Sequence, residues 1–372
     1  GGDERRQSGV SDMRQKSYLI LLLVALFAGC KSGRQYFPKQ VAPAEINILR
    51  FDSALLSIDA QGDSVKTDIL RLYNEYPDFM GFYSEQILGI EAGDTAFMLE
   101  ALPKYLTDTI YHFAEVNREA RDCFSNIEDI RRELNAAFGK IKYLYPEWQM
   151  PELTFFVSGF NASLLFWESS NYQIVRQPTD DQIGQNPFNT PLRIAVGVDM
   201  YLGTDYEYYN RVVWNYQKQT MRKECIPADV VSAYLFRMLP FTSSKSRLLD
   251  NMLYRGKVMY LLSVLFPEQP DYEIMGYSKE QWEWAEKNER GVWQMIVDKR
   301  DLWKTESPVL TSYLNDGPFT AEISQDAPPR LGTFIGWHIA ESYMENNPDV
   351  TMQQLMEEGD AQKVLEMSRY KP

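Results

Sequence analysis

The histidines are the first residues to consider as catalytic or metal-binding groups, and the chain of 372 residues has only two of them, His112 and His338. They lie 226 positions apart, so they do not form the closely spaced pair with which one helix binds zinc. A serine or cysteine nucleophile would need one of them as its base, but no Gly-x-Ser-x-Gly turn presents a serine. Glu341 follows His338 by one helical turn and is suited to hold its ring. A structural role is the simpler interpretation, and a hydrolase that uses His338, Glu341 and distant carboxylates is the alternative.

Other motifs that bind cofactors or metals are also missing from the sequence. Neither a Gly-x-x-x-x-Gly-Lys phosphate loop nor a Gly-x-Gly-x-x-Gly fingerprint occurs, and the acidic pairs lack the spaced oxygen ligands of a calcium loop. The aromatic run from Tyr206 to Tyr209, with Trp214 and Tyr216, fits a platform for a sugar or peptide or, more simply, packing in a core. We therefore expect no cofactor and no metal, with a ligand-binding protein as a further alternative.

Cys30 is the cysteine with the clearest chemical role. A basic segment, Met13–Tyr18, is followed by the apolar run Leu19–Gly29, which stops at Cys30. This order is typical of a bacterial lipoprotein signal peptide, in which the cysteine receives the lipid. The run is shorter than the roughly 20 residues that a membrane-spanning helix needs. We therefore predict a signal peptide within residues 1–29, lipid attachment at Cys30, and a tether over residues 30–44.

The remaining composition describes a folded, acidic, exported domain. Cys123 and Cys225 are too few for a disulfide framework, so they are either one pair or two free thiols. The hydrophobic content of 44% supports a large core. A formal net charge of −14 argues against nucleic acid as a partner, because phosphate contacts need clustered lysine and arginine.

The elements that position these residues are mainly helices. Helical periodicity covers most of residues 45–144 and returns after about residue 208. Two short β-prone runs, Leu153–Val157 and Arg193–Val198, lie between these regions. We predict a mainly α fold with a small β component, in one domain over residues 45–372. Within it we expect a helical layer over residues 45–150 and a part with a small sheet and helices over residues 151–372.

Several segments of the chain resemble the GldB family of gliding-motility lipoproteins of Bacteroidetes. The likeness is carried by Ile226–Met238 (IPADVVSAYLFRM), Leu249–Tyr260 (LDNMLYRGKVMY), Gly332–Tyr343 (GTFIGWHIAESY) and Leu365–Tyr370 (LEMSRY). The lipoprotein signal agrees with this family. The resemblance implies a membrane-anchored envelope protein that is not an enzyme and supports gliding motility or type IX secretion through contacts with other envelope proteins.

That family in turn distantly resembles zinc peptidases of the gluzincin type. In those enzymes one helix carries His-Glu-x-x-His and a second helix supplies a third metal ligand. The template places Ser232 and Phe236 on the histidines, Ala233 on the catalytic glutamate and Arg255 on the third ligand; the spacing of 19 positions between Phe236 and Arg255 fits. Hydroxyl, phenyl and guanidinium groups do not bind zinc. The resemblance implies a degenerate zincin-like architecture without its metal or base.

The resemblance also gives the β-prone run Arg193–Val198 a role. In peptidases of this type an edge strand lies beside an extended substrate, so Ile194 and Val196 are predicted to lie on an edge that binds a partner strand. The residues after Cys30, Lys31 to Arg34, lack the acidic run that resembles the surface-export signal of Bacteroidetes lipoproteins. We therefore expect the domain to face the periplasm, anchored in either membrane.

Overall fold

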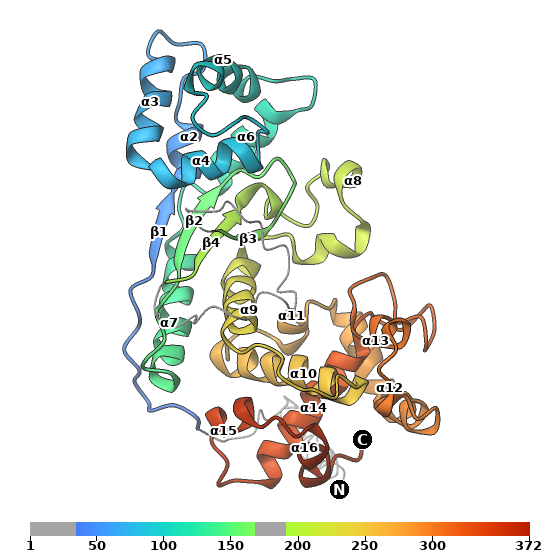
Figure 1. Cartoon of the computed structure of the whole chain (residues 1–372). Helices are drawn as coiled ribbons and strands as arrows, with labels where there is room; N and C mark the ends of the chain where they lie inside the picture. The colour runs from blue at the N-terminus through green and yellow to red at the C-terminus, as the bar shows by residue number, and fades with distance from the viewer. Residues whose placement is uncertain (1–34, 168–190) are drawn as a thin grey trace, which may run out of the picture. The chain divides into compact units, whose positions relative to one another are not determined.

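The computed structural model describes residues 35–167 and 191–372, and Lys39–Pro372 form one compact unit (Figure 1). It confirms the predicted mainly α fold with a small β component. Within these residues no helix is long and apolar enough to cross a bilayer. The predicted signal segment and Cys30 lie outside the described residues.

The helices of the N-terminal half are α2 (Phe51–Leu56), α3 (Val65–Glu75), α4 (Pro77–Gln86), α5 (Thr95–Leu106), α6 (Phe113–Cys123) and α7 (Glu128–Leu144).

The helices of the C-terminal half follow the sheet in the chain. They are α8 (Tyr209–Val212), α9 (Ile226–Met238), α10 (Leu248–Leu265), α11 (Asp271–Met275), α12 (Lys279–Asp298), α13 (Ser307–Leu314), α14 (Leu331–Asn346), α15 (Met352–Glu357) and α16 (Ala361–Ser368). Short 3-10 helices connect them: η2 (Val198–Met200), η3 (Asn215–Thr220), η4 (Lys223–Cys225) and η5 (Asp301–Trp303).

The sheet consists of β1 (Asn47–Arg50), β2 (Glu152–Phe156), β4 (Arg193–Gly197) and β3 (Leu164–Phe166), in that spatial order. The first three are parallel, and β3 is antiparallel to β4. Because successive side chains of a strand point to opposite faces, β2 packs on helices from both sides. Phe156 lies against Phe79 of α4 with 5.7 Å between ring centroids, and Phe155 lies 6.5 Å from Phe124, directly after α6.

The prediction that Ile194 and Val196 lie on an edge strand is wrong. Their strand, β4, pairs with β2 on one side and with β3 on the other, and both side chains are completely buried. All of the backbone hydrogen bonding of an interior strand is directed at its neighbours, so β4 has no free edge for a partner. The edges of this sheet are β1 and β3.

The division into a helical layer over residues 45–150 and a later part that holds the sheet also needs correction. β1 lies in the supposed helical layer and pairs with β2 along its whole length. A run of four residues is too short for periodicity to reveal it, and the same is true of β3. The helical periodicity expected over most of residues 45–144 is interrupted between α5 and α6, where His112 takes a left-handed conformation (φ 64°).

The two most apolar long helices, α10 and α14, are in direct backbone contact. Gly256 of α10 faces Gly336 of α14, and a Cβ added at Gly256 would lie 2.1 Å from the carbonyl carbon of Gly336. A Cβ added at Gly336 would lie 1.9 Å from the carbonyl oxygen of Met252. Glycine is therefore required at both positions by the close approach of the helices. This crossing fixes α10, which carries Arg255 and Lys257, against α14, which carries His338.

Candidate functional site

The first of the template helices, α9, places two polar residues on one face. Pro227 lies in its first turn, where a backbone N–H has no intrahelical partner to lose. Asp229 and Ser232 are separated by three positions and therefore project from the same side of the helix. Both line a cavity of about 300 Å³, which we call the Asp229 cavity.

The other template positions are used for packing and anchoring. Phe236 packs edge-on against Tyr254 of α10, with ring centroids 5.6 Å apart. Arg255 donates a hydrogen bond from Nη1 to the carbonyl oxygen of Leu314, at 2.9 Å. Burial and the positive charge of Arg330 lower the pKa of the Arg255 guanidinium from its usual value of 12.5. The structure therefore brings Ser232 to the cavity and ties Arg255 to the end of α13.

The Asp229 cavity lies where the sheet meets the C-terminal helices. Its wall includes Ser163, the residue before the edge strand β3, and Tyr201, the residue after η2. Further polar wall residues come from separate elements or connections: Gln219 from η3, Glu273 from α11, Gln281 from α12, Asp316 after α13 and Arg330 before α14. Polar groups from distant parts of the sequence thus converge on one concave site, as they do in ligand-binding pockets.

The carboxyl group of Asp229 is the most perturbed acidic group of this cavity. It accepts a hydrogen bond from Tyr201 Oη at 3.0 Å. Burial raises the pKa of the Asp229 carboxyl to about 7, because Tyr201 and the positive charges of Arg330 and Arg222 only partly offset the loss of water. A carboxyl group that titrates near neutral pH can bind a cation or exchange a proton, and such groups are enriched at functional sites.

Arg330 has contacts of its own within the cavity wall. Its Nη2 donates to the carbonyl oxygen of Met275, and its Nε lies 3.6 Å from Asp316 Oδ1. The guanidinium also lies over the ring of Tyr277, at 5.8 Å from the centroid. Arg330 is thus anchored to α11, to the segment after α13 and to the Tyr277 ring, and it acts on Asp229 only at a distance.

Sequence reasoning missed the main residues of this site. Asp229 resembles an ordinary acidic residue in the first turn of a helix, where it would favour the helix dipole. Tyr201 and Arg330 lie in connections without a motif. The available signal was the position of Asp229 one turn before Ser232, on the face that the peptidase template assigns to the metal.

His338 belongs to a different, partly buried cluster. Its Nδ1 lies 2.6 Å from Glu289 Oε1 of α12, and the same oxygen accepts a hydrogen bond from Tyr370 Oη at 2.6 Å. The expectation that Glu341 holds the ring was therefore wrong, since the hydrogen bond goes to Glu289 on a neighbouring helix. Burial alone would lower the pKa of His338, but the hydrogen bond and charge of Glu289, with the charges of Glu341 and Glu286, raise it. The cluster ties α12, α14 and the C-terminus together.

Removal of this imidazole is expected to change the pH dependence of stability. Because the folded-state pKa of His338 is raised above 6.5, its charged form stabilises the fold fully below about pH 6.5, and this contribution is lost as the pH rises through the folded-state value. We expect His338→Phe to lower the free energy of unfolding by about 1–3 kcal/mol at pH 6 and by less at pH 9. Urea denaturation from pH 6 to 9 measures this, and His112→Phe, which removes the half-buried imidazole outside this cluster, is the control. A loss of unfolding free energy that is the same at pH 6 and at pH 9 would contradict this role of His338.

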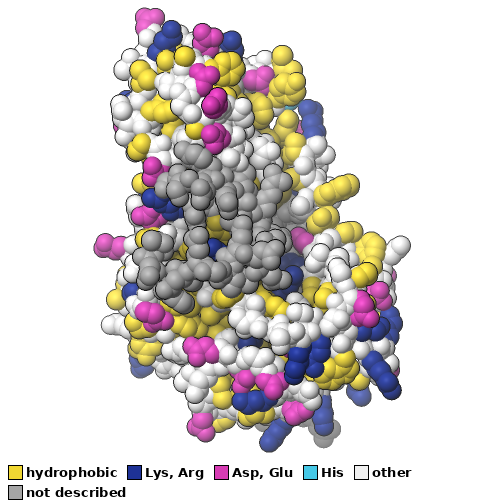
Figure 2. Space-filling view, in the orientation of Figure 1, with side chains coloured by type: hydrophobic (Ala, Val, Ile, Leu, Met, Phe, Trp, Pro, Cys, Tyr) yellow, Lys and Arg dark blue, Asp and Glu magenta, His cyan; other side chains and the backbone are white. Residues whose placement is uncertain are grey.

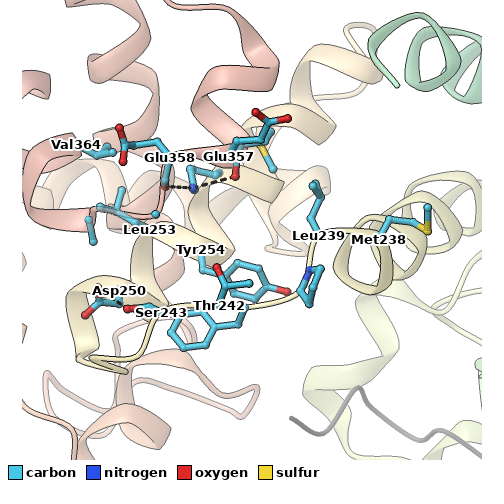
Figure 3. A pocket seen from close by; sticks show the side chains of 16 residues that line it. Met238, Leu239, Thr242, Ser243, Asp250, Leu253, Tyr254, Glu357, Glu358 and Val364 are labelled. Atoms are coloured by element: carbon cyan, nitrogen blue, oxygen red, sulfur yellow. Dashed lines mark hydrogen bonds between the residues drawn. The ribbon is translucent and has the colours of Figure 1, made fainter. Parts of the chain in front are cut away.

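A second cavity, of about 280 Å³, lies between α10 and the turn from α15 to α16; we call it the Lys257 cleft (Figure 3). Glu357 and Glu358 lie on one side of it, and Thr242 and Ser243 on the other. The amine of Lys257 donates hydrogen bonds to the carbonyl oxygens of Leu355, Met356 and Glu358, at 3.1, 3.3 and 2.9 Å. All three donors of the ammonium are therefore occupied, and Lys257 closes the C-terminal end of α15.

The aromatic residues expected either in a platform or in the core do not share one surface. Tyr209 is completely buried and donates from Oη to the carbonyl oxygen of Asp199, at 2.8 Å. Trp214 is 72% exposed, and Tyr216 lines the Asp229 cavity. Tyr206 packs edge-on against Tyr209, with 5.1 Å between ring centroids. A platform that includes Tyr209 is excluded by its burial.

Cys123 and Cys225 do not form a reactive site in the described part of the chain. Cys123 and Cys225 are separate free thiols, and burial raises the pKa of both, that of Cys225 to about 12. These thiols are therefore poor nucleophiles. Among residues 35–167 and 191–372, no group of three or more histidine, cysteine, aspartate or glutamate side chains is arranged to hold a metal ion.

Comparisons with known proteins identify the family. No curated protein and no solved structure matches the chain. A family model described as gliding motility protein GldB matches residues 37–372, which is the whole of the described domain apart from its first two residues. The segments that carry the resemblance in the sequence, on α9, α10, α14 and α16, all lie within this match. The chain belongs to the GldB family of gliding motility proteins.

Proposed function

We propose that this protein is a non-catalytic envelope lipoprotein that supports gliding motility, type IX protein secretion, or both, through contacts with other envelope proteins. The family match supports the motility role. Lipid on Cys30 would anchor the protein in the membrane, and residues 31–44 would tether the domain. The absence of an acidic run after Cys30 supports a position that faces the periplasm.

The observation that carries the non-catalytic assignment is the anchoring of Arg255. Where the peptidase template requires a metal ligand, this side chain places a guanidinium that is hydrogen bonded to Leu314 and lies within electrostatic range of Arg330. Two positive charges at this point oppose the binding of a metal dication. Phe236, in the second histidine position, is packed against Tyr254. These contacts support the part of the proposal that no metal is bound at this position.

Complementation of a strain that lacks this protein tests the proposal. We expect the wild-type chain and Ser232→Ala to restore spreading and secretion equally, because Ser232 carries no chemistry in this proposal. Cys30→Ala should abolish both restoration and recovery in the membrane fraction. Crosslinking in cells should attach the wild-type protein to components of the gliding or secretion apparatus. Stoichiometric zinc in the purified protein, with a peptidase activity lost on chelation, would disprove the non-catalytic assignment.

A hydrolase remains the second candidate because Asp229 titrates near neutral pH beside Tyr201 in a concave site. In that case Asp229 would act as the general base or acid, with Ser232 one turn away. The two candidates differ in one measurement. A hydrolase must release product from a peptide mixture in the wild-type protein and not in Asp229→Asn, whereas a scaffold releases none in either.

A further inference from the structure

The carboxyl group of Asp229 has few hydrogen-bond partners within the described residues. A carboxylate has about four acceptor sites, and Asp229 uses one of them, for Tyr201 Oη. The two cations that act on it from a distance have other contacts: Arg330 donates from Nη2 to Met275 O and lies 3.6 Å from Asp316, and Arg222 lies 3.0 Å from Glu273. Within the described residues, Asp229 therefore faces the cavity without a direct counter-ion.

The fully buried aspartates of the described residues are arranged differently. Four aspartates with exposed fractions of 4% or less each have a cationic partner or at least three hydrogen bonds. Asp52 pairs with Arg50 at 2.8 Å, Asp250 with Arg247 at 2.7 Å, Asp301 with Lys304 at 2.6 Å, and Asp199 accepts hydrogen bonds from Ser158 N, Ser158 Oγ and Phe160 N. Asp229, by contrast, is only half-buried and opens onto the cavity, so its free acceptor positions are accessible to an external group.

The charged residues of the cavity wall indicate what kind of external group would bind beside Asp229. Its wall holds three carboxylates, those of Asp229, Glu273 and Asp316, and one guanidinium, that of Arg330. Gln219 adds a neutral amide group to the wall, whereas the amide oxygens of Gln217 and Gln281 already accept hydrogen bonds from Trp214 N and Ser278 N. Acidic side chains are also spread across the molecular face shown in Figure 2, and the chain has a formal net charge of −14. Because Glu273 is paired with Arg222 and Asp316 lies beside Arg330, Asp229 is the wall carboxylate that is left to attract a cation.

We propose that the Asp229 cavity binds a cationic nitrogen group, the ammonium of a lysine side chain or of a peptide N-terminus, with Asp229 as its direct partner and Tyr201 as the residue that positions the carboxylate. A volume of about 300 Å³ accommodates such a side chain with its aliphatic stem. Met259 and Leu262 of α10 provide an apolar wall for that stem. This inference goes beyond the proposed function and does not depend on it.

Binding is coupled to the ionisation of Asp229. The titratable and charged groups that face it are Tyr201, Cys225, Arg222, Glu273, Asp316 and Arg330. Of these, Cys225 and Tyr201 have pKa values raised by burial and stay neutral at pH 6–8. Asp229, with its pKa of about 7, is therefore the group that changes charge in this range, and only its ionised form attracts an ammonium group.

Calorimetric titration of the purified domain with Nα-acetyl-lysine amide tests the proposal. Because the ionised fraction of Asp229 rises about tenfold between pH 6 and pH 8, we expect the association constant to rise about tenfold as well, with proton release at pH 6. The uncharged analogue Nα-acetyl-norleucine amide should not bind. Glycinamide, titrated at pH 7, distinguishes a peptide N-terminus from a lysine side chain as the preferred source of the ammonium.

Two variants complete the experiment. Asp229→Asn keeps the shape of the side chain and should remove both binding and its pH dependence, whereas Asp298→Asn removes an exposed carboxylate outside the cavity and should change neither. Thermal melting confirms that each variant is folded. The proposal is overturned if neither amine binds to the wild-type protein, if the norleucine analogue binds equally well, if acetate binds in preference to the amines, or if Asp229→Asn retains the binding.

Discussion

Gly336→Ala is expected to destabilise the protein by about 3–5 kcal/mol or to prevent folding. The added Cβ would lie 1.9 Å from the carbonyl oxygen of Met252, which is part of the backbone of α10. A backbone atom cannot rotate away as the end of a side chain can, so α10 and α14 must separate and lose packing along their contact. The intrinsic helix preference of alanine over glycine, about 1 kcal/mol, offsets only a fraction of this loss.

The same substitution elsewhere supplies the control. Gly291 lies on the exposed face of α12, and a Cβ added there would meet no atom within 4 Å. Gly291→Ala should therefore stabilise the protein by about 0.5–1 kcal/mol. Gly256→Ala, on the α10 side of the contact, should be as damaging as Gly336→Ala. Urea denaturation measures all three, and a loss of less than about 1 kcal/mol for Gly336→Ala would show that the helices do not approach this closely.

The long amphipathic helices could be predicted from the sequence because their signal is repeated over several turns. The helical periodicity predicted after about residue 208 corresponds to long helices such as α12 and α14. Short strands carry too few residues for such a signal, so β1 and β3 were missed. The spatial order of the strands could not be predicted either, since it depends on pairings between segments more than 100 residues apart, such as Asn47 with Glu152.

The candidate site was harder to predict for a related reason. Its polar groups come from separate elements, and their importance depends on which ionic and hydrogen-bond partners each one has in the folded state. Asp229 is notable because the nearest cations are bonded to other groups, and no local pattern in the sequence records that. The template did lead to Ser232 on the correct helix face, but it gave no indication that Arg255 is tied to Leu314.

Lys257→Met is the second substitution with a large expected effect. Methionine retains most of the aliphatic stem but removes the ammonium, so the carbonyl oxygens of Leu355, Met356 and Glu358 lose their shared donor. Leaving such acceptors unpaired in a buried site should lower the free energy of unfolding by about 2–4 kcal/mol. Hydrogen exchange should show the loss first in α15 and α16, which this contact fastens to α10. The exposed Lys287→Met on α12 is the matched control and should change stability by less than about 0.5 kcal/mol.

The loss of unfolding free energy caused by Lys257→Met should also depend on pH. Burial lowers the pKa of Lys257 to about 8, although the charge of Glu358 acts against this. The unfolded chain therefore binds more protons than the folded one between about pH 8 and pH 10.5, and the stability of the wild-type protein rises with pH in that window relative to a variant without the amine. The difference between wild type and Lys257→Met should thus be larger at pH 10 than at pH 7. A difference that shrinks toward pH 10 would mean that the charged ammonium, with all three of its hydrogen bonds, is the form that fastens α15.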